Sequence, residues 1–174
     1  MTKILISGFG GQGVLTLGQL IAGIALNKGK EVTWMPSYGA EMRGGTANCS
    51  VILSDKLIGS PMVQNNIDIL CAMNRPSVDK FLPRVKPGGL VFVNTSIVTD
   101  KIDRADVKVV EIDATNVAVK AGSARVANMV MLAGFLKETD LFTLDDIVQV
   151  LEKRFADKGA DLIPLNIEAI KLGM

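Results

Sequence analysis

The segment "SGFGGQGV", residues 7–14, is the stretch that decides the fold. Its glycines follow the spacing G-x-G-x-x-G, at Gly8, Gly10 and Gly13. The compact apolar run at 2–7 before it predicts a short buried strand, and residues 14–28 after it carry apolar side chains at helical spacing. A strand, a glycine turn and a helix in this order are the opening of a doubly wound α/β domain.

The rest of the chain continues this alternation of strands and helices. Further strands are predicted over 31–35, 47–53, 67–73, 90–94 and 107–112. Helices are predicted over 77–85, from Thr115 onward, and over 125–137, 144–155 and 162–171. Thr143, followed by Asp146, predicts an N-terminal cap for the helix over 144–155. We therefore expect one Rossmann-like, three-layer domain over residues 1–174, with a mostly parallel sheet and a helical C-terminal part.

One segment departs from the simplest nucleotide-binding plan. Residues 36–46, "PSYGAEMRGGT", have no apolar period and contain three glycines, which predicts a loop. Residues 47–53 alternate as a strand, and Ser54 and Asp55 can turn the chain so that residues 56–58 return beside it. The sheet is therefore expected to contain one antiparallel hairpin.

The composition bounds the kinds of partner. Lys and Arg number 19 against 18 Asp and Glu without a block of like charge, so we expect no nucleic-acid partner. The longest apolar stretch, at 14–26, is too short and too polar to span a bilayer, and we expect neither a signal peptide nor a membrane partner. Cys49 and Cys71 lie in apolar runs, which favours buried thiols in a reducing cytoplasmic compartment over a disulfide.

The chain contains no histidine. Ser-His and Cys-His nucleophile pairs, His-rich zinc sites and a histidine general base are therefore excluded. The two cysteines cannot supply the four thiolates that an iron–sulfur cluster usually needs. We accordingly predict a chain that binds and positions a ligand, without catalytic or metal-binding side chains of its own.

The glycine turn has two interpretations. In the first, it lets a pyrophosphate approach the backbone, and the amides at the helix start face the anion. In the second, it only allows the helix to pack closely on the strand. A dinucleotide-dependent dehydrogenase also needs an acidic residue at the end of the second strand. Here that strand ends in "WMPSY", and the nearest acid is Glu41 in the loop, so a phosphate site is favoured over an NAD site.

Polar residues at the carboxyl ends of parallel strands mark where such sheets bind ligands. On the predicted strands these residues are Ser7, Ser37, Asn74 and Asn94. Arg43 in the neighbouring loop can contact a phosphate or pair with Glu41. Asn74 and Asn94 can instead cap the turns that follow them. One apolar stripe is interpreted as core rather than as an interface: Val126, Met129, Val130 and Ala133.

Four motifs together resemble the gamma subunit of the 2-oxoacid:ferredoxin oxidoreductases: "SGFGGQGV", "PSYGAEMRGGTANC", "PGGLVFVN" and "ARVANMVMLAG". The resemblance covers almost the whole chain. It implies an enzyme that decarboxylates a 2-oxoacid on thiamine diphosphate, passes electrons through iron–sulfur clusters to ferredoxin, and transfers the acyl group to coenzyme A. It also implies that alpha and beta subunits and a ferredoxin-like delta subunit hold the thiamine diphosphate, the magnesium and the clusters, and that this chain is inactive alone.

For this chain the resemblance implies a part in the coenzyme A site and in assembly. The glycine turn would face the coenzyme A phosphates through Gly8, Gly10, Gly11, Gln12 and Gly13. The loop would lie towards the catalytic subunits through Tyr38, Glu41, Arg43, Gly44 and Gly45. The loop sequence "SYGAEMRGG" is more similar to the 2-oxoglutarate and ketoisovalerate types than to the pyruvate type. The alternatives are an indolepyruvate oxidoreductase subunit, a self-contained NAD(P)-dependent oxidoreductase, and a structural spacer whose turn binds nothing.

Overall fold

The computed structural model describes residues 1–38, 45–156 and 162–174. Its strands are β1 (Thr2–Phe9), β2 (Glu31–Tyr38), β3 (Thr46–Ser54), β4 (Ile67–Ala72), β5 (Val85–Asn94) and β6 (Lys108–Ile112). Its helices are α1 (Val14–Asn27), α2 (Arg75–Phe81), α3 (Ala114–Ala121), α4 (Ala127–Glu138), α5 (Leu144–Phe155) and α6 (Leu162–Gly173), with 3-10 turns at Leu82–Arg84 and Ala124–Val126. None of the helices in these ranges has the length and apolar character needed to cross a membrane.

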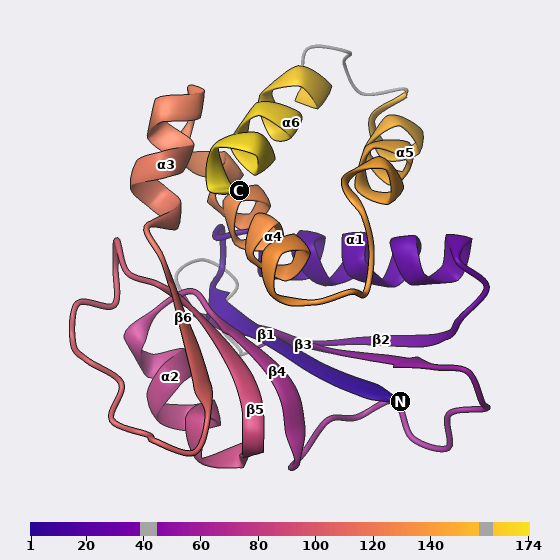
Figure 1. Ribbon diagram of the computed structural model, residues 1–174, viewed down its shortest axis with the longest axis vertical. Helices are drawn as coiled ribbons and strands as arrows, with labels where there is room; N and C mark the ends of the chain where they lie inside the picture. Colours follow the sequence, from indigo (N-terminus) through magenta and orange to yellow (C-terminus); the bar gives the residue numbers. More distant parts are fainter. Residues whose placement is uncertain (39–44, 157–161) are drawn as a thin grey trace.

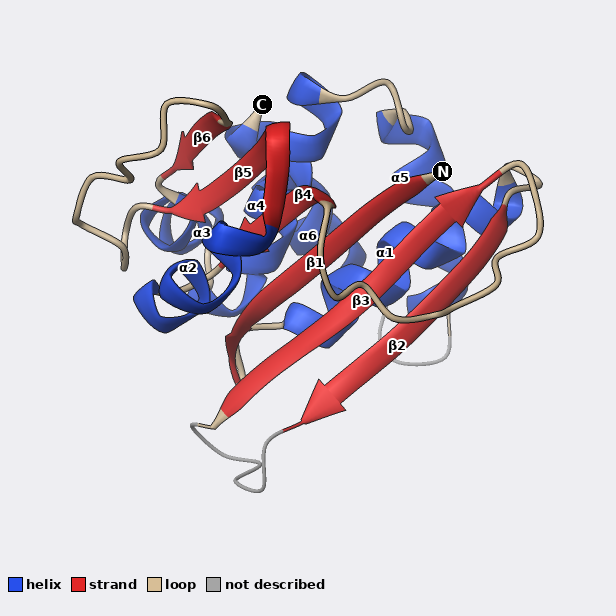
Figure 2. Cartoon of the chain, turned by 90° about the horizontal axis from the view of Figure 1, so that it is seen from below, coloured by secondary structure: helices blue, strands red, loops and turns tan. Residues whose placement is uncertain are grey.

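The strands form one six-stranded sheet in the order β2-β3-β1-β4-β5-β6. β1, β4, β5 and β6 are parallel, whereas β3 is antiparallel to both of its neighbours. Figure 1 shows α1, α3, α4, α5 and α6 on one face of the sheet and α2 on the other, and Figure 2 shows the same layers from below. The predicted three-layer α/β fold, with a mostly parallel sheet and one antiparallel hairpin, is confirmed.

The partner of β3 in that hairpin differs from the prediction. Residues 56–58 form no strand in the described chain, and β3 pairs instead with β2 and β1. β2 also continues through residues 36–38, which were predicted as loop. Pro36 is tolerated there because β2 is an edge strand, where a missing backbone N–H need not break a pairing.

The boundaries around α2 also differ from the prediction. α2 begins before Ser77, because Asn74 accepts the Ser77 amide at 3.0 Å and caps the helix, with Pro76 in its first turn. The remainder of the predicted helix is a 3-10 turn. β5 begins at Val85, opposite Ile67, and a bulge between the two strands follows before regular pairing resumes.

The larger core lies between the sheet and α1 and α4, and it includes the predicted core stripe of Val126, Met129, Val130 and Ala133. Gly18 lets α1 approach the sheet closely, because a Cβ there would lie 2.4 Å from Cys49 Sγ. Cys49 and Cys71 both pair with Ile6, on either side of it, so their backbones are about 10 Å apart, too far for a disulfide. Both are free and buried, and burial raises the pKa of the Cys49 thiol to about 12.

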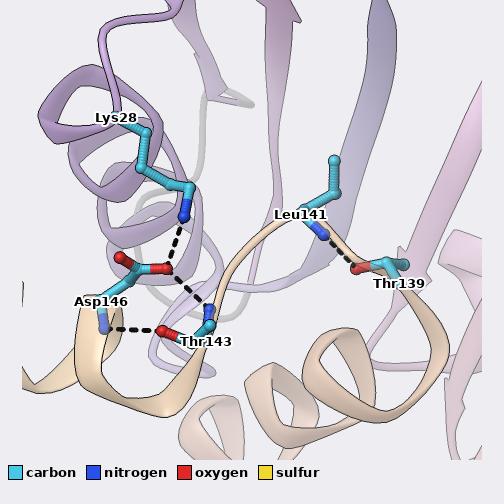
Figure 3. Close-up of polar contacts among 5 residues, drawn as sticks. All are labelled: Lys28, Thr139, Leu141, Thr143 and Asp146. Carbon is cyan, nitrogen blue, oxygen red and sulfur yellow. Dashed lines mark hydrogen bonds and ion pairs between the residues drawn. The ribbon is translucent and has the colours of Figure 1, made fainter.

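The N-terminus of α5 is capped by its own side chains, as predicted (Figure 3). Thr143 Oγ1 accepts the Asp146 amide at 3.3 Å, and Asp146 Oδ2 accepts the Thr143 amide at 2.8 Å. Lys28 Nζ, from the C-cap residue of α1, lies 2.8 Å from the same carboxylate oxygen. The ion pair joins the end of α1 to the start of α5, at a carboxylate that the capping pair already holds in place.

Candidate functional site

The connections that leave β1 and β4 run in opposite directions. From β1 the chain passes through α1, on one face of the sheet, to β2; from β4 it passes through α2, on the other face, to β5 (Figure 1). Open α/β sheets bind ligands at such a switch point, outside the carboxyl ends of the strands. The glycine turn that follows β1, and Met73 and Asn74 that follow β4, lie at this point.

The glycines of the turn meet different geometric needs. Gly11 and Gly13 have positive φ angles of 96° and 73°, which residues with a side chain rarely adopt. A Cβ at Gly8 would lie 2.6 Å from Gln12 Oε1 and 2.8 Å from the Cβ of Met73. A Cβ at Gly11 would meet nothing within 4 Å. Gly8 therefore serves close packing, whereas Gly11 lies exposed on the outside of the turn.

Gln12 holds the turn from within. Its Oε1 accepts the Phe9 amide at 2.7 Å and Asn74 Nδ2 at 3.2 Å. Its Nε2 donates to the Met73 carbonyl at 3.3 Å. The Gln12 side chain therefore ties the turn to the end of β4, and its hydrogen bonds are made inside the protein.

The start of α1 has no cap of its own. Gly13 is the N-cap residue, and within the described chain no side chain caps this helix and no acidic residue stands in its first turn. The Gly13 carbonyl accepts the Leu17 amide at 2.9 Å and Asn128 Nδ2 at 3.2 Å. Because the C=O and N–H of a trans peptide point in opposite directions, these bonds aim the Val14 N–H out of the helix start. Such amides, with the helix dipole, stabilise an anion.

Asn128 is not among the predicted site residues. It is 5% exposed, and a Cβ at Gly13 would lie 2.4 Å from its Nδ2. Its side chain therefore fixes the start of α1 from α4. The available signal is an uncharged polar residue inside the otherwise apolar run "VANMVMLAG", residues 126–134. The pairing with Gly13 spans 115 positions in the sequence, so only the folded chain shows what that residue contacts.

Ser7 and Asn74 are buried beneath the turn. Ser77 Oγ donates to Asn74 Oδ1 at 2.7 Å and lies 2.9 Å from Ser7 Oγ. Asn74 also caps α2 and donates to Gln12. Of the two roles considered for Asn74, the structure therefore shows the cap, and Asn74 supports the turn through Gln12.

Asn94 lies at the end of β5, separated from β1 by β4. It is fully buried, its Nδ2 donates to Thr115 Oγ1 at 3.0 Å, and its Oδ1 accepts the Ser96 amide at 3.3 Å. Its backbone carbonyl also accepts the amides of Ile97 and Val98. Asn94 therefore shapes the turn after β5, which is again the capping role.

The segment between β2 and β3 begins and ends at the same edge of the sheet as the glycine turn. Tyr38 pairs with Ala47, and the Gly45 carbonyl accepts the Gly10 amide at 3.0 Å. Ser37 is exposed and lies on the side of the sheet that carries α2. Three predicted site residues lie outside the described residues: Glu41, Arg43 and Gly44.

The described part of the site offers hydrogen-bond donors rather than reactive side chains. Across residues 1–38, 45–156 and 162–174, no three His, Cys, Asp or Glu side chains come together as metal ligands would. The residues brought together at the turn are glycines, amides and hydroxyls: Ser7, Gly8, Gly10, Gly11, Gln12, Gly13, Gly45, Asn74 and Asn128. Chemically, this arrangement can bind an anion and hold it in one orientation.

Comparisons with known proteins agree on one family. The family described as pyruvate ferredoxin/flavodoxin oxidoreductase matches residues 3–174. The ketoisovalerate oxidoreductase subunit VorA of Methanothermobacter thermautotrophicus is 36% identical over 173 residues, which are 98% of this chain and 35% of that relative. The 2-oxoglutarate synthase subunit KorC of Methanocaldococcus jannaschii is 34% identical over 152 residues, 86% of this chain and 81% of that relative. The chain therefore spans about a third of the length of VorA and most of KorC.

Solved structures show the same fold. The gamma subunit of a keto/oxoacid ferredoxin oxidoreductase from Geobacter sulfurreducens has a TM-score of 0.82 at 28% identity, over 99% of this chain and 96% of that chain. The 2-oxoglutarate:ferredoxin oxidoreductase from Magnetococcus marinus, solved with 2-oxoglutarate, coenzyme A and succinyl-CoA bound, has a TM-score of 0.89 at 25% identity. That match covers 99% of this chain and 30% of the longer one.

Proposed function

The chain belongs to the pyruvate ferredoxin/flavodoxin oxidoreductase family, and we propose that it is the gamma subunit of a multisubunit 2-oxoacid:ferredoxin oxidoreductase. The complete enzyme decarboxylates a 2-oxoacid, forms an acyl-coenzyme A and passes the electrons to ferredoxin. This chain contributes to the coenzyme A site and to assembly, and it is inactive alone. The observation that carries the proposal is the start of α1, which lies uncapped at the switch point of the sheet.

In this proposal the phosphates of coenzyme A lie against Gly10, Gly11 and Gly13 and the first amides of α1. Gln12 and Asn128 hold those peptide groups in place through the hydrogen bonds described above. The relative from Magnetococcus marinus, solved with coenzyme A bound, supports this ligand. The loop that contains Tyr38, Glu41, Arg43, Gly44 and Gly45 is proposed to lie towards the catalytic subunits.

The remaining cofactors are assigned to partner chains. Alpha and beta subunits would hold thiamine diphosphate and magnesium, and a ferredoxin-like delta subunit would hold iron–sulfur clusters. This division is supported by a chain that has no histidine and only two cysteines, both buried. The relatives VorA and KorC support ketoisovalerate or 2-oxoglutarate as the 2-oxoacid. The two free thiols support a reducing, cytosolic compartment.

Gly11 offers the clearest test of the phosphate role. A Cβ at Gly13 would collide with Asn128, so a substitution there would alter packing and binding together. A Cβ at Gly11 meets nothing within 4 Å, so Gly11→Asp places a negative charge at the turn without a collision. In the reconstituted complex we expect the KM for coenzyme A to rise about tenfold, because the carboxylate repels the phosphates. The KM for the 2-oxoacid should stay unchanged.

Gly29 provides the matched control at the other end of α1. It also has a positive φ, of 72°, and a Cβ there would meet nothing within 4 Å, so Gly29→Asp adds the same charge at a comparably unfavourable backbone conformation. We expect it to leave the KM for coenzyme A at the wild-type value. Equal KM values in the wild-type and Gly11→Asp complexes would overturn the phosphate role of the turn.

The end of β2 does not support the alternative of a self-contained NAD(P)-dependent oxidoreductase. Such an enzyme uses a carboxylate at the end of that strand to hold a ribose hydroxyl. In β2 the only carboxylate is Glu31, the first residue, which lies at the opposite end of the strand from the glycine turn. Saturable NAD(H) binding by the isolated chain would contradict this exclusion.

A further inference from the structure

The face of the sheet opposite α1 carries a row of polar residues across three neighbouring strands. Ser7 of β1 pairs with Asn48 of β3, and Asn48 pairs with Ser37 of β2. Directly paired residues place their side chains on the same face. Leu5, two residues before Ser7, packs in the core on the α2 side, so the whole row faces that side.

A hollow of about 370 Å³ opens beside this row, between the β2–β3 hairpin and α2. Its lining includes Ser37, Asn48 and Ser50 on the sheet and Lys80 and Arg84 on the other side. Ser50 Oγ accepts the Val63 amide at 3.1 Å, which leaves the hydroxyl proton available to a ligand. The volume suits a small molecule rather than a folded partner.

Two cations stand at the rim of this hollow. Lys80 Nζ lies 5.2 Å and Arg84 Cζ lies 5.3 Å from the centre of the Phe81 ring. Their neighbours in sequence are paired with acids, since Arg75 bonds Asp79 and Lys86 bonds Asp68. Within the described chain, Lys80 and Arg84 have no carboxylate partner, and no Asp or Glu lines the hollow.

We propose that this hollow binds a small molecule that carries a phosphate group. Both cations line one hollow whose described lining contains no carboxylate, and a phosphate bound there would neutralise their charge. The guanidinium of Arg84 can donate two hydrogen bonds to phosphate oxygens, and Lys80 adds a point charge. Ser37, Asn48 and Ser50 supply neutral donors for the rest of the molecule. The site lies on the face of the sheet opposite α1, and it does not rest on the function proposed for the glycine turn.

The test uses the chain of residues 1–174 and inorganic phosphate as the probe. Titration should give saturable changes in the backbone amide NMR signals of Gln64 and Arg84, which both line the hollow. The double variant Lys80→Gln, Arg84→Gln should bind phosphate at least about tenfold more weakly, whereas Lys80→Arg, Arg84→Lys should bind within about threefold of the wild type. Lys153→Gln on the exposed side of α5 is the control and should bind as the wild type does.

Two further titrations identify where the phosphate comes from. If coenzyme A displaces inorganic phosphate from the hollow and dephospho-coenzyme A does not, the group is the 3′-phosphate of the coenzyme. If neither displaces it, the ligand is a separate phosphorylated metabolite, whether or not the glycine turn binds coenzyme A. Unchanged phosphate binding in the double glutamine variant would overturn the proposal. So would an absence of saturable shifts together with protection of Lys80 and Arg84 on complex assembly, because the two cations would then form a subunit contact.

Discussion

The starts of α1 and α5 show two opposite ways to begin a helix. α5 closes its own N-terminus with Thr143 and Asp146, and Lys28 covers the same carboxylate (Figure 3). α1 begins at Gly13, and within the described chain no side chain caps it. The turn before α1 is nevertheless fixed by hydrogen bonds, because Gln12 accepts the Phe9 amide and Asn128 donates to the Gly13 carbonyl.

The two helix starts are expected to serve different purposes, folding stability at α5 and ligand binding at α1. At α5 side chains accept the Thr143 and Asp146 amides, so the gain is in folding free energy. At α1 the Gln12 and Asn128 side chains bond carbonyl groups, and within the described chain no side chain caps the helix, so we propose that a ligand occupies its first amides. Substitutions at α5 should therefore change stability alone, whereas those around α1 should also change ligand binding.

The largest expected effect is at Gly8. Gly8→Ala places a Cβ within 2.6 to 2.9 Å of Gln12, Met73 and Val14, which forces the turn away from β4. We expect a loss of about 2 to 3 kcal/mol in the free energy of unfolding, measured by urea denaturation. Gly11→Ala is the control, because it meets no atom within 4 Å and should lose only about 1 kcal/mol through its positive φ. Equal losses at both positions would show that the turn is not closely packed against β4.

The second effect is at Asn128. Asn128→Ala removes the hydrogen bond to the Gly13 carbonyl and frees the peptide that aims the Val14 amide. In the complex we expect the KM for coenzyme A to rise about tenfold, with the KM for the 2-oxoacid unchanged. Asn166→Ala is the control, since Asn166 is also buried but bonds the Leu162 carbonyl within its own helix. A similar rise in both variants would assign the effect to general loosening of the chain.

The third effect is at Thr143. Thr143→Ala removes the side-chain acceptor for the Asp146 amide at the start of α5. We expect the free energy of unfolding to fall by about 1 kcal/mol in thermal or urea denaturation. The KM for coenzyme A should not change, because the start of α5 contacts Lys28, at the opposite end of α1 from the glycine turn. A raised KM would contradict the separation of the two helix starts.

The smallest effect is the pH dependence at Asp146. The hydrogen bond from Lys28, together with that from the Thr143 amide, holds the pKa of the Asp146 carboxyl below its usual range. A folded-state pKa below the unfolded value stabilises the protein above the unfolded pKa, and this gain is lost as pH falls through the folded pKa. We expect Asp146→Asn to be less stable by under about 1 kcal/mol at pH 7, with the gap shrinking below about pH 4. A gap that stays constant in urea denaturation down to pH 3 would contradict this linkage.

Much of this molecule could be predicted from local patterns. The strand, glycine turn and helix at the N-terminus follow from apolar spacing and three glycines, and the cap of α5 follows from Thr143 and Asp146. The lack of a carboxylate at the end of β2 can also be read directly from residues 34–38. Such features depend on residues a few positions apart, where propensity and hydrogen-bonding geometry decide the outcome.

The partners of distant residues could not be predicted in this way. β3 pairs with β2 and β1 rather than with residues 56–58, because pairing is decided by which strands bury the most apolar surface together. The sequence leaves two roles open for Asn74 and Asn94, ligand binding and capping, and only the structure shows which buried groups their side chains bond. Lys80 and Arg84 line the same hollow as Ser37 of β2 and Asn48 of β3, and only the folded chain brings these four residues together.

The sequence by itself therefore determined the class of fold, the place of the glycine turn and the absence of histidine chemistry. Only the tertiary structure decided that the turn is held by Gln12 and Asn128 and that the start of α1 lies uncapped at the switch point between β1 and β4. The physical reason is the range of the interactions. Turns and caps are decided within a few residues, whereas the groups that hold this site come from segments more than 60 positions apart, such as Gln12 and Asn74.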